Sequence, residues 1–185
     1  MGRWEPDAQG RMIRAAMELF AERGFDQTTA GDIAERAGVT ERTFFRHFSD
    51  KREVLFDGSG TMQRTAYEAI VGAPADLSPL DAALAGMVAA AGLLRDRRDH
   101  AVRRSQIVAA NPSLHERELL KLAAMADAAA KALHERGVDE PAASLAAHSA
   151  VTVFHIAFDR WVSTDEPPDF ADCITDAAAA LRALR

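Results

Sequence analysis

Apolar side chains recur at intervals of three and four residues along most of the chain, which is the spacing of one face of an α-helix. Near the start, Ile13, Ala16, Met17 and Phe20 show this spacing. No segment alternates apolar and polar residues between turn residues, as a half-buried β-strand would. The pattern therefore predicts an all-α protein. The predicted helices cover residues 7–23, 30–37, 41–48, 51–70, 79–95, 99–110, 112–136, 141–163 and 169–184.

Capping residues and helix breakers set the predicted boundaries. Thr29 and Thr40 suit the N-caps of the second and third helices, and Gly38 suits the end of the second. No low-complexity linker interrupts the chain, and we place the functional boundary within the fourth helix. We expect an N-terminal three-helix domain over residues 1–52 and a C-terminal helical bundle over residues 53–185.

Two short predicted helices, residues 30–37 and 41–48, are joined by a tight turn at residues 37–40. Gly38 supplies the backbone conformation that such a turn needs, and Val39 is placed to pack beneath both helices. A short helix, a glycine turn and a second helix are typical of the helix-turn-helix motif. In that motif the second helix enters the major groove of DNA.

The second of these helices has two chemically different faces. Phe44 and Phe48 are four residues apart, point the same way and are expected in the core. Arg42 and Arg46 lie on the opposite side of the helical wheel. Because arginine can donate a pair of hydrogen bonds to guanine, we predict that both read bases, with a phosphate contact or a solvated charged face as the alternatives.

The overall charge would not suit a general polyanion-binding protein, because the formal net charge is −6. Positive charge is nevertheless concentrated around the second short helix, where Arg42, Arg46, Lys51 and Arg52 accompany a single acid, Asp50. This distribution favours a local contact with nucleic acid.

Composition excludes two broad classes of protein. The hydrophobic content of 48% is too high for a disordered acidic chain. No apolar run is long enough for a transmembrane helix, so we expect no membrane partner. The single cysteine, Cys173, cannot form an internal disulfide, and the start of the chain has no apolar signal-peptide core. We therefore expect a cytoplasmic protein.

A set of spaced residues resembles a known family. Together they are similar to the DNA-binding domain of the tetracycline-repressor (TetR-like) family, over about residues 10–56. The residues that carry the resemblance are Thr28-Thr29, Ile33-Ala34, Ala37-Gly38-Val39-Thr40, Thr43-Phe44-Phe45-Arg46-His47-Phe48 and Lys51. The resemblance implies about nine helices, a homodimer, operator DNA as partner, a ligand-binding C-terminal domain, and repression relieved by a small molecule.

The resemblance also implies roles for individual residues. Phosphate contacts are expected from Thr29, Thr40, Thr43 and Lys51. His47 is expected near the DNA backbone. The family often has glycine where this chain has Arg42, which adds a base-reading group, and often tyrosine where it has Phe45, which instead suits a sugar or thymine methyl. Glu41 could accept a hydrogen bond from cytosine or support the helix N-terminus, and Arg3 could reach a minor groove or belong to a disordered tail.

The C-terminal bundle is expected to hold the effector and the dimer interface. Candidate pocket residues are Met62, Met87, Met125, Phe154, His155 and Phe158, with plain core packing as the alternative for the apolar ones. We expect an apolar small molecule as the effector. The dimer is expected through the helices at residues 141–163 and 169–184. The small residues that would allow close packing there are Ala146, Ala147, Ala150, Ala177 and Ala180.

Two other functions are consistent with parts of the sequence. His148, His155 and Asp159 share a face of one predicted helix, which could serve a small helical enzyme, a metal site or polar ligand anchors. A helical adaptor that binds protein through its C-terminal bundle is the second alternative. The sequence contains no recognisable nucleophile or zinc-type spacing, so we expect no catalytic residues, no metal and no cofactor. A DNA-binding transcriptional repressor is the favoured interpretation.

Overall fold

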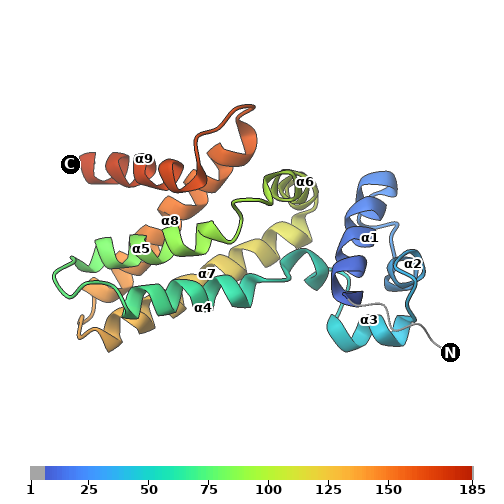
Figure 1. Cartoon of the computed structure of the whole chain (residues 1–185), viewed down its shortest axis with the longest axis horizontal. Helices are drawn as coiled ribbons and strands as arrows, with labels where there is room; N and C mark the ends of the chain where they lie inside the picture. Colours follow the sequence, from blue (N-terminus) through green and yellow to red (C-terminus); the bar gives the residue numbers. More distant parts are fainter. Residues whose placement is uncertain (1–6, 185) are drawn as a thin grey trace. The chain divides into compact units, whose positions relative to one another are not determined.

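The computed structural model describes residues 7–184, and within them the chain forms nine α-helices, one short 3-10 helix and no β-strand (Figure 1). The all-α prediction is confirmed. Arg3 lies outside the described residues. The elements are α1 (Ala8–Arg23), α2 (Ala30–Arg36), α3 (Glu41–His47), η1 (Glu53–Phe56), α4 (Ser59–Val71), α5 (Pro79–Gly92), α6 (Arg98–Ala109), α7 (Pro112–Glu135), α8 (Ala142–Ser163) and α9 (Phe170–Ala183).

The chain divides into two compact units. Unit 1 comprises the chain up to Asp57 together with Arg103–Glu116, and unit 2 comprises Gly58–Val102 and the chain from Arg117 onward. The first break thus follows Asp57 rather than residue 52. A later segment also belongs to unit 1, because Val108 and Leu114 are buried in its apolar core.

The helix predicted over residues 51–70 is wrong in its first part. That stretch contains the 3-10 helix η1 and then, after a break, α4. Gly58 has φ +87°, a left-handed conformation that interrupts a right-handed helix and that glycine adopts without a steric penalty. The three residues Val54, Leu55 and Phe56 are all buried in unit 1. These three side chains anchor η1 in unit 1, and the break at Gly58 separates η1 from α4.

Unit 1 is organised by the caps that the sequence predicts. The side chain of Thr29 accepts a hydrogen bond from the amide of Asp32 and completes a capping box at the start of α2. The side chain of Thr40 accepts from the amide of Thr43 at the start of α3. Gly38 has φ +68° in the turn between these helices, and the amide of Val39 donates to the carbonyl of Ala34. Both predicted N-caps are confirmed.

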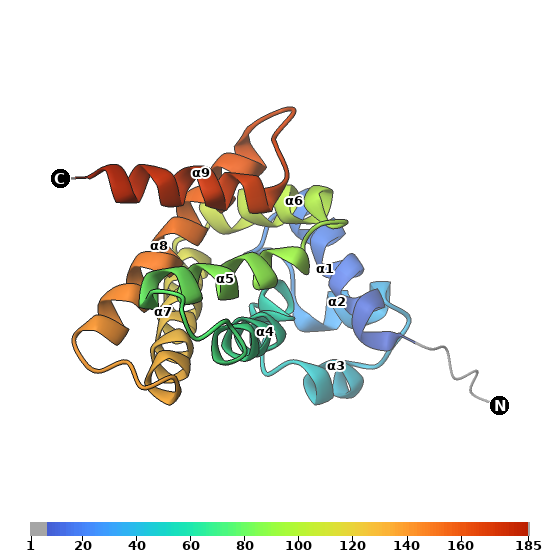
Figure 2. The ribbon, with the colours of Figure 1, turned by 60° about the vertical axis from the view of Figure 1, so that its left-hand side comes forward.

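Unit 2 is a bundle of apolar helices in which α5 packs against α4, α8 and α9 (Figure 2). None of the described helices combines the length and apolar character needed to cross a membrane. The crossing of α4 and α5 depends on Gly86. A Cβ atom there would lie 2.5 Å from Cγ1 of Ile70 and 2.8 Å from the carbonyl oxygen of Ala66. Only a residue without a side chain allows this approach.

We expect Gly86→Ala to lower the free energy of unfolding by about 1–3 kcal/mol, because the backbone of α4 must shift to accept a methyl group. Urea denaturation followed by circular dichroism measures the change. Gly60→Ala in α4 is the matched control, because a Cβ atom at Gly60 meets no heavy atom within 4 Å. Equal stability of the two variants would contradict the assigned role of Gly86.

Candidate nucleic-acid interface

The helix α3 is held in unit 1 by aromatic side chains on one of its faces. Phe44 and Phe48 are buried in the core, with ring centroids 5.4 Å apart. The amide of Phe48 donates to the carbonyl of Phe44, which closes the last turn of the helix. The predicted inward direction of both phenylalanines is confirmed, and it fixes which face of α3 remains open.

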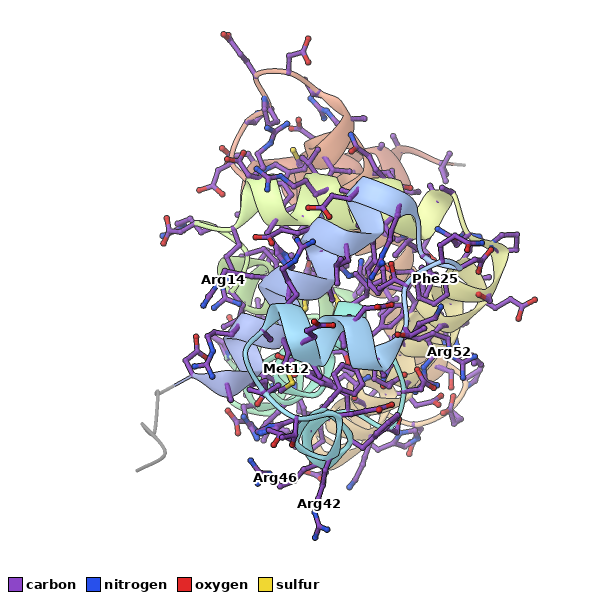
Figure 3. All side chains as sticks on the ribbon, turned by 90° about the vertical axis from the view of Figure 1, so that its right-hand side faces the viewer. Met12, Arg14, Phe25, Arg42, Arg46 and Arg52 are labelled. Atoms are coloured by element: carbon purple, nitrogen blue, oxygen red, sulfur yellow. The ribbon has the colours of Figure 1, made fainter. Side chains whose placement is uncertain are left out.

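Arg42 and Arg46 occupy the open face of α3. Both are exposed, and Figure 3 shows their side chains projecting away from the ribbon. Among the described residues, neither guanidinium group has a hydrogen bond or ion pair. This contrasts with Arg36, which binds Glu22 with a nitrogen–oxygen distance of 2.9 Å, and with Arg52, which binds Asp50 at 2.8 Å. Two arginine donors are thus available to a ligand outside the chain.

Three further candidates lie on α3 beside these arginines. The ring of Phe45 is 52% exposed and meets Phe44 edge-on, with ring centroids 5.4 Å apart. His47 is exposed, and its ring centroid lies 6.4 Å from that of Phe48. Glu41 is exposed in the first turn of α3, where a carboxylate stabilises the helix N-terminus. The exposed aromatic ring adds apolar surface to an otherwise charged face.

The hydroxyl groups of Thr40 and Thr43 form a pair at the start of α3. Their oxygen atoms are 3.0 Å apart, and the oxygen of Thr40 also accepts from the amide of Thr43. A hydroxyl group has one hydrogen to donate, so the pair uses one of its two hydrogens internally. The other hydrogen is available to an external acceptor such as a phosphate oxygen.

The hydroxyl group of Thr29 is used within the protein. It donates to Oδ2 of Asp32 at 2.7 Å and accepts from the amide of Asp32 at 3.1 Å. The hydrogen bonds from the side chain and backbone of Thr29, together with nearby Arg23, hold the pKa of Asp32 below its ordinary value. The carboxylate therefore stays charged and keeps the only hydroxyl hydrogen of Thr29 engaged. The phosphate contact of Thr29 stays a prediction.

The ammonium group of Lys51 is also engaged within unit 1. It donates to the carbonyl oxygens of Phe25 and Thr28, both at 2.8 Å, and lies 3.4 Å from that of Asp26. It sits 4.2 Å from the centroid of the Phe25 ring. These contacts give Lys51 partners within unit 1, and its phosphate contact stays a prediction.

The apolar candidates for the effector pocket lie together in unit 2. Met87, Met125 and Phe154 are buried in its core, and Met62 and Phe158 pack against that core. Both phenylalanines pack against Phe170 in tilted or edge-on geometry, with the Phe154 and Phe158 ring centroids 5.1 and 5.9 Å from that of Phe170. The core-packing alternative therefore has direct support for the phenylalanines.

The polar candidates of α8 do not join this core. His155 is only partly buried, and its Nε2 lies 3.6 Å from Oδ2 of Asp159. The ring nitrogen Nδ1 of His148 lies 2.9 Å from the carbonyl oxygen of Ser144. Within residues 7–184, no three His, Cys, Asp or Glu side chains gather as a set of metal ligands. Each histidine is thus accounted for by a local contact on its own helix.

Comparison with known families assigns both parts of the chain. The family described as bacterial regulatory proteins, tetR family, matches residues 12–57. The family described as the MftR C-terminal domain matches residues 77–185, which is more than half of the chain. The chain belongs to the TetR family. The resemblance seen in the sequence is therefore confirmed, and the family is one of regulatory proteins.

One relative of this TetR-family chain is itself a transcriptional regulator. The transcriptional regulator TcmR of Streptomyces glaucescens is 38% identical over 86 residues, which are 46% of this chain and 38% of TcmR. The chain thus matches less than half the length of this relative.

Two solved structures share the fold over nearly the whole chain. FadR from Bacillus subtilis in complex with stearoyl-CoA has a TM-score of 0.64 at 20% identity, covering 94% of this chain and 97% of FadR. FadR from Thermus thermophilus, a transcriptional repressor in complex with lauroyl-CoA, has a TM-score of 0.55 at 23% identity, covering 94% and 93%. At these identities the similarity establishes the fold of this TetR-family member.

Arg104 stabilises unit 1 of this TetR-family chain, although no pattern in the sequence indicates it. Nε of Arg104 donates to the carbonyl oxygen of Leu55 at 2.6 Å, and its guanidinium carbon lies 4.9 Å from the centroid of the Phe56 ring. The partners are about fifty positions away along the chain. No local pattern links an arginine in one helix to a backbone carbonyl that far away, so only the folded structure reveals the contact.

We expect Thr29→Ala to lower the free energy of unfolding by about 1 kcal/mol, because it removes the N-cap of α2. Thr29→Ser is the matched control and retains the hydroxyl group. Thermal unfolding followed by circular dichroism compares the two variants with the wild type. Wild-type stability of Thr29→Ala would show that the capping box contributes nothing.

Proposed function

We propose that this TetR-family chain is a sequence-specific DNA-binding regulator that acts as a homodimer and represses transcription until a small-molecule effector releases it. The observation that carries the proposal is the pair of exposed, unpaired guanidinium groups of Arg42 and Arg46 on α3. Operator binding would take place in the cytoplasm, as expected from the sequence. The two TetR-family domains and the helix-turn-helix geometry support this assignment.

In the proposed complex, α3 lies in the major groove. Arg42 and Arg46 donate to the O6 and N7 acceptors of guanine, while Phe45 packs against a sugar or a thymine methyl group. The hydrogen left over in the Thr40–Thr43 pair goes to a phosphate oxygen. Glu41 and His47 border the same surface, beside a base and the DNA backbone respectively. Base contacts supply sequence preference, whereas phosphate contacts set the register of the helix.

The proposed dimer forms through α8 and α9, which pack against each other in unit 2. Ala146, Ala147 and Ala150, which are among the small residues expected to allow close helix packing, are buried in the unit's own core. The exposed apolar residues of α8 are instead Leu145 and Ile156, which are 65% and 55% exposed. They are eleven positions apart, which is about three helical turns, and so share one face. Self-association would remove both from water.

The proposed effector is an apolar small molecule that binds within unit 2. The methionines Met62, Met87 and Met125 support this choice, because flexible side chains with polarisable sulfur repack around irregular ligands. Release of DNA requires that the effector bind more tightly to the dimer state in which the two α3 helices no longer match successive major grooves. Lauroyl-CoA and stearoyl-CoA, in which the acyl chain is the apolar part, are the first compounds to test, since the two solved neighbours are in complex with them.

We expect the wild-type protein to enrich one near-palindromic duplex from a random library, with half-sites about ten base pairs or a multiple apart. Arg42→Ala should weaken binding to that duplex by about 1–3 kcal/mol and relax the preference at one position of each half-site, because one base contact is lost. Fluorescence anisotropy with single-substitution duplexes measures both effects. Arg97→Ala, an exposed arginine of unit 2, controls for the loss of charge. An intact preference in Arg42→Ala would refute the base-reading role.

We expect Ile156→Asp to convert the dimer into a folded monomer, because it places a charge in an apolar interface while changing nothing in the core of unit 2. Sedimentation velocity gives the mass, and circular dichroism confirms the fold. The matched control is Leu120→Asp on α7, because Leu120 is 60% exposed and lies outside the proposed interface. If both variants remain dimeric, the interface lies elsewhere.

A further inference from the structure

The two helices of the helix-turn-helix are joined closely at only one of their ends. There, the amide of Gly38 donates to the carbonyl of Glu35 and that of Val39 to the carbonyl of Ala34. At the other end, the loop before α2 and the segment after α3 are connected along the chain only through both helices and the turn between them. Core packing between α2 and α3 limits the angle between the helices, and a contact between those two segments holds that angle at the open end. The side chain of Lys51 makes such a contact.

Lys51 follows α3 in the chain, and its ammonium group reaches the loop between α1 and α2. The carbonyl oxygens of Phe25, Asp26 and Thr28 surround it at 2.8, 3.4 and 2.8 Å. An ammonium group has three hydrogens to donate, so this set of acceptors satisfies its donor capacity. The Phe25 ring, 4.2 Å away at its centroid, adds a cation–π contact. In Figure 3, Phe25 lies well away from the projecting tips of the α3 arginines.

The loop that Lys51 holds is itself ordered up to the first residue of the capping box. Thr28 is fully buried, and its hydroxyl donates to the carbonyl of Gly24 at 2.8 Å. The amide of Thr28 donates to the carbonyl of Phe25, one of the oxygens that also accept from Lys51. Thr29 follows directly as the N-cap of α2. A displacement of the ammonium group would therefore displace the start of α2.

We infer that Lys51 is a positioning residue that ties the segment after α3 to the start of α2, and thereby sets the direction in which α3 presents Arg42 and Arg46 to DNA. The inference rests on the proposed DNA-binding function. It differs from a phosphate contact, because every donor of the ammonium group already has a carbonyl acceptor inside unit 1. Loss of Lys51 then weakens binding through the geometry of α3 rather than through a lost ion contact.

The test compares two variants of Lys51 with the wild type on the duplex that the wild type selects from a random library. Affinity is measured at 25 °C over a range of salt concentrations. Melting curves first establish that every variant is folded at this temperature. A lost phosphate contact lowers the slope of log K against log salt by about 0.9, whereas a change of geometry leaves the slope as it was. Amide hydrogen exchange of the DNA-free protein reports on residues 24–30.

Lys51→Met keeps the apolar stem and removes the ammonium group. We expect binding to weaken about tenfold, which is the lower end of what a charge-assisted hydrogen bond contributes, by the same factor at every salt concentration. Exchange over residues 24–30 should accelerate in the free protein. Arg52→Met is the matched control for exchange. It also removes a positive charge, at the next position in the chain, but Arg52 is paired with Asp50. It should leave exchange in this loop unchanged.

Lys51→Arg separates the two roles and safeguards the test if Lys51→Met does not fold. Arginine would preserve a phosphate contact and its salt slope. Its planar guanidinium group does not place a single compact donor among three carbonyls, so positioning would be lost despite the retained charge. We expect Lys51→Arg to bind more weakly than the wild type, with an unchanged slope and faster loop exchange.

Several results would overturn the inference. One is wild-type affinity in Lys51→Arg together with a reduced salt slope in Lys51→Met, which would identify a phosphate contact. Another is wild-type affinity in both variants with only a lower melting temperature, which would leave Lys51 a purely stabilising role. If the wild type selects no duplex, the proposed function itself fails and the inference falls with it, whatever the loop exchange shows.

Discussion

The burial of Phe44 and Phe48 is the constraint on which the candidate interface depends. A helix as short as α3, Glu41–His47, does not hold together by its own hydrogen bonds in water, so its stability comes from packing. The two rings are buried in unit 1 and point one face of α3 inward. The helical period then places Arg42 and Arg46 outward. The same apolar contacts that stabilise the unit therefore also orient the groups proposed to read DNA.

The candidate DNA contacts differ in whether their hydrogen-bond donors are free or already used within the protein, and residue type alone does not show this difference. Arg42 and Arg46 have no partner among the described residues, whereas the polar groups of Thr29 and Lys51 are satisfied within unit 1. A group already bonded internally gains little from a phosphate, because it exchanges one hydrogen bond for another. The sequence identifies the residue types suited to DNA, but the three-dimensional structure shows which of them are free. The proposed set of contacts is accordingly narrower than the sequence alone would suggest.

Local patterns predicted the fold well because capping and periodicity act over a few residues. Thr40 is an N-cap as predicted, and apart from the start of the fourth helix the predicted helix ends lie within three residues of the observed ones. Gly58 was overlooked as the break between η1 and α4, although consecutive apolar residues before a glycine could have indicated it. Contacts between distant segments left no such signal: the approach at Gly86 and the hydrogen bond from Arg104 to Leu55 depend on tertiary packing. The pattern also could not decide which alanines of α8 face the core of their own unit.

Net charge sets a further condition on the proposed function. With a formal charge of −6, the protein as a whole is repelled by DNA at long range, so attraction must come from the few cations close to the surface of contact. One copy of α3 contributes only two unpaired arginines to that contact. Joining two copies makes the second contact intramolecular and multiplies the affinity, provided that both helices fit their grooves at once. An effector that alters only the separation of the two helices in the proposed dimer would therefore release the DNA without changing any group on α3.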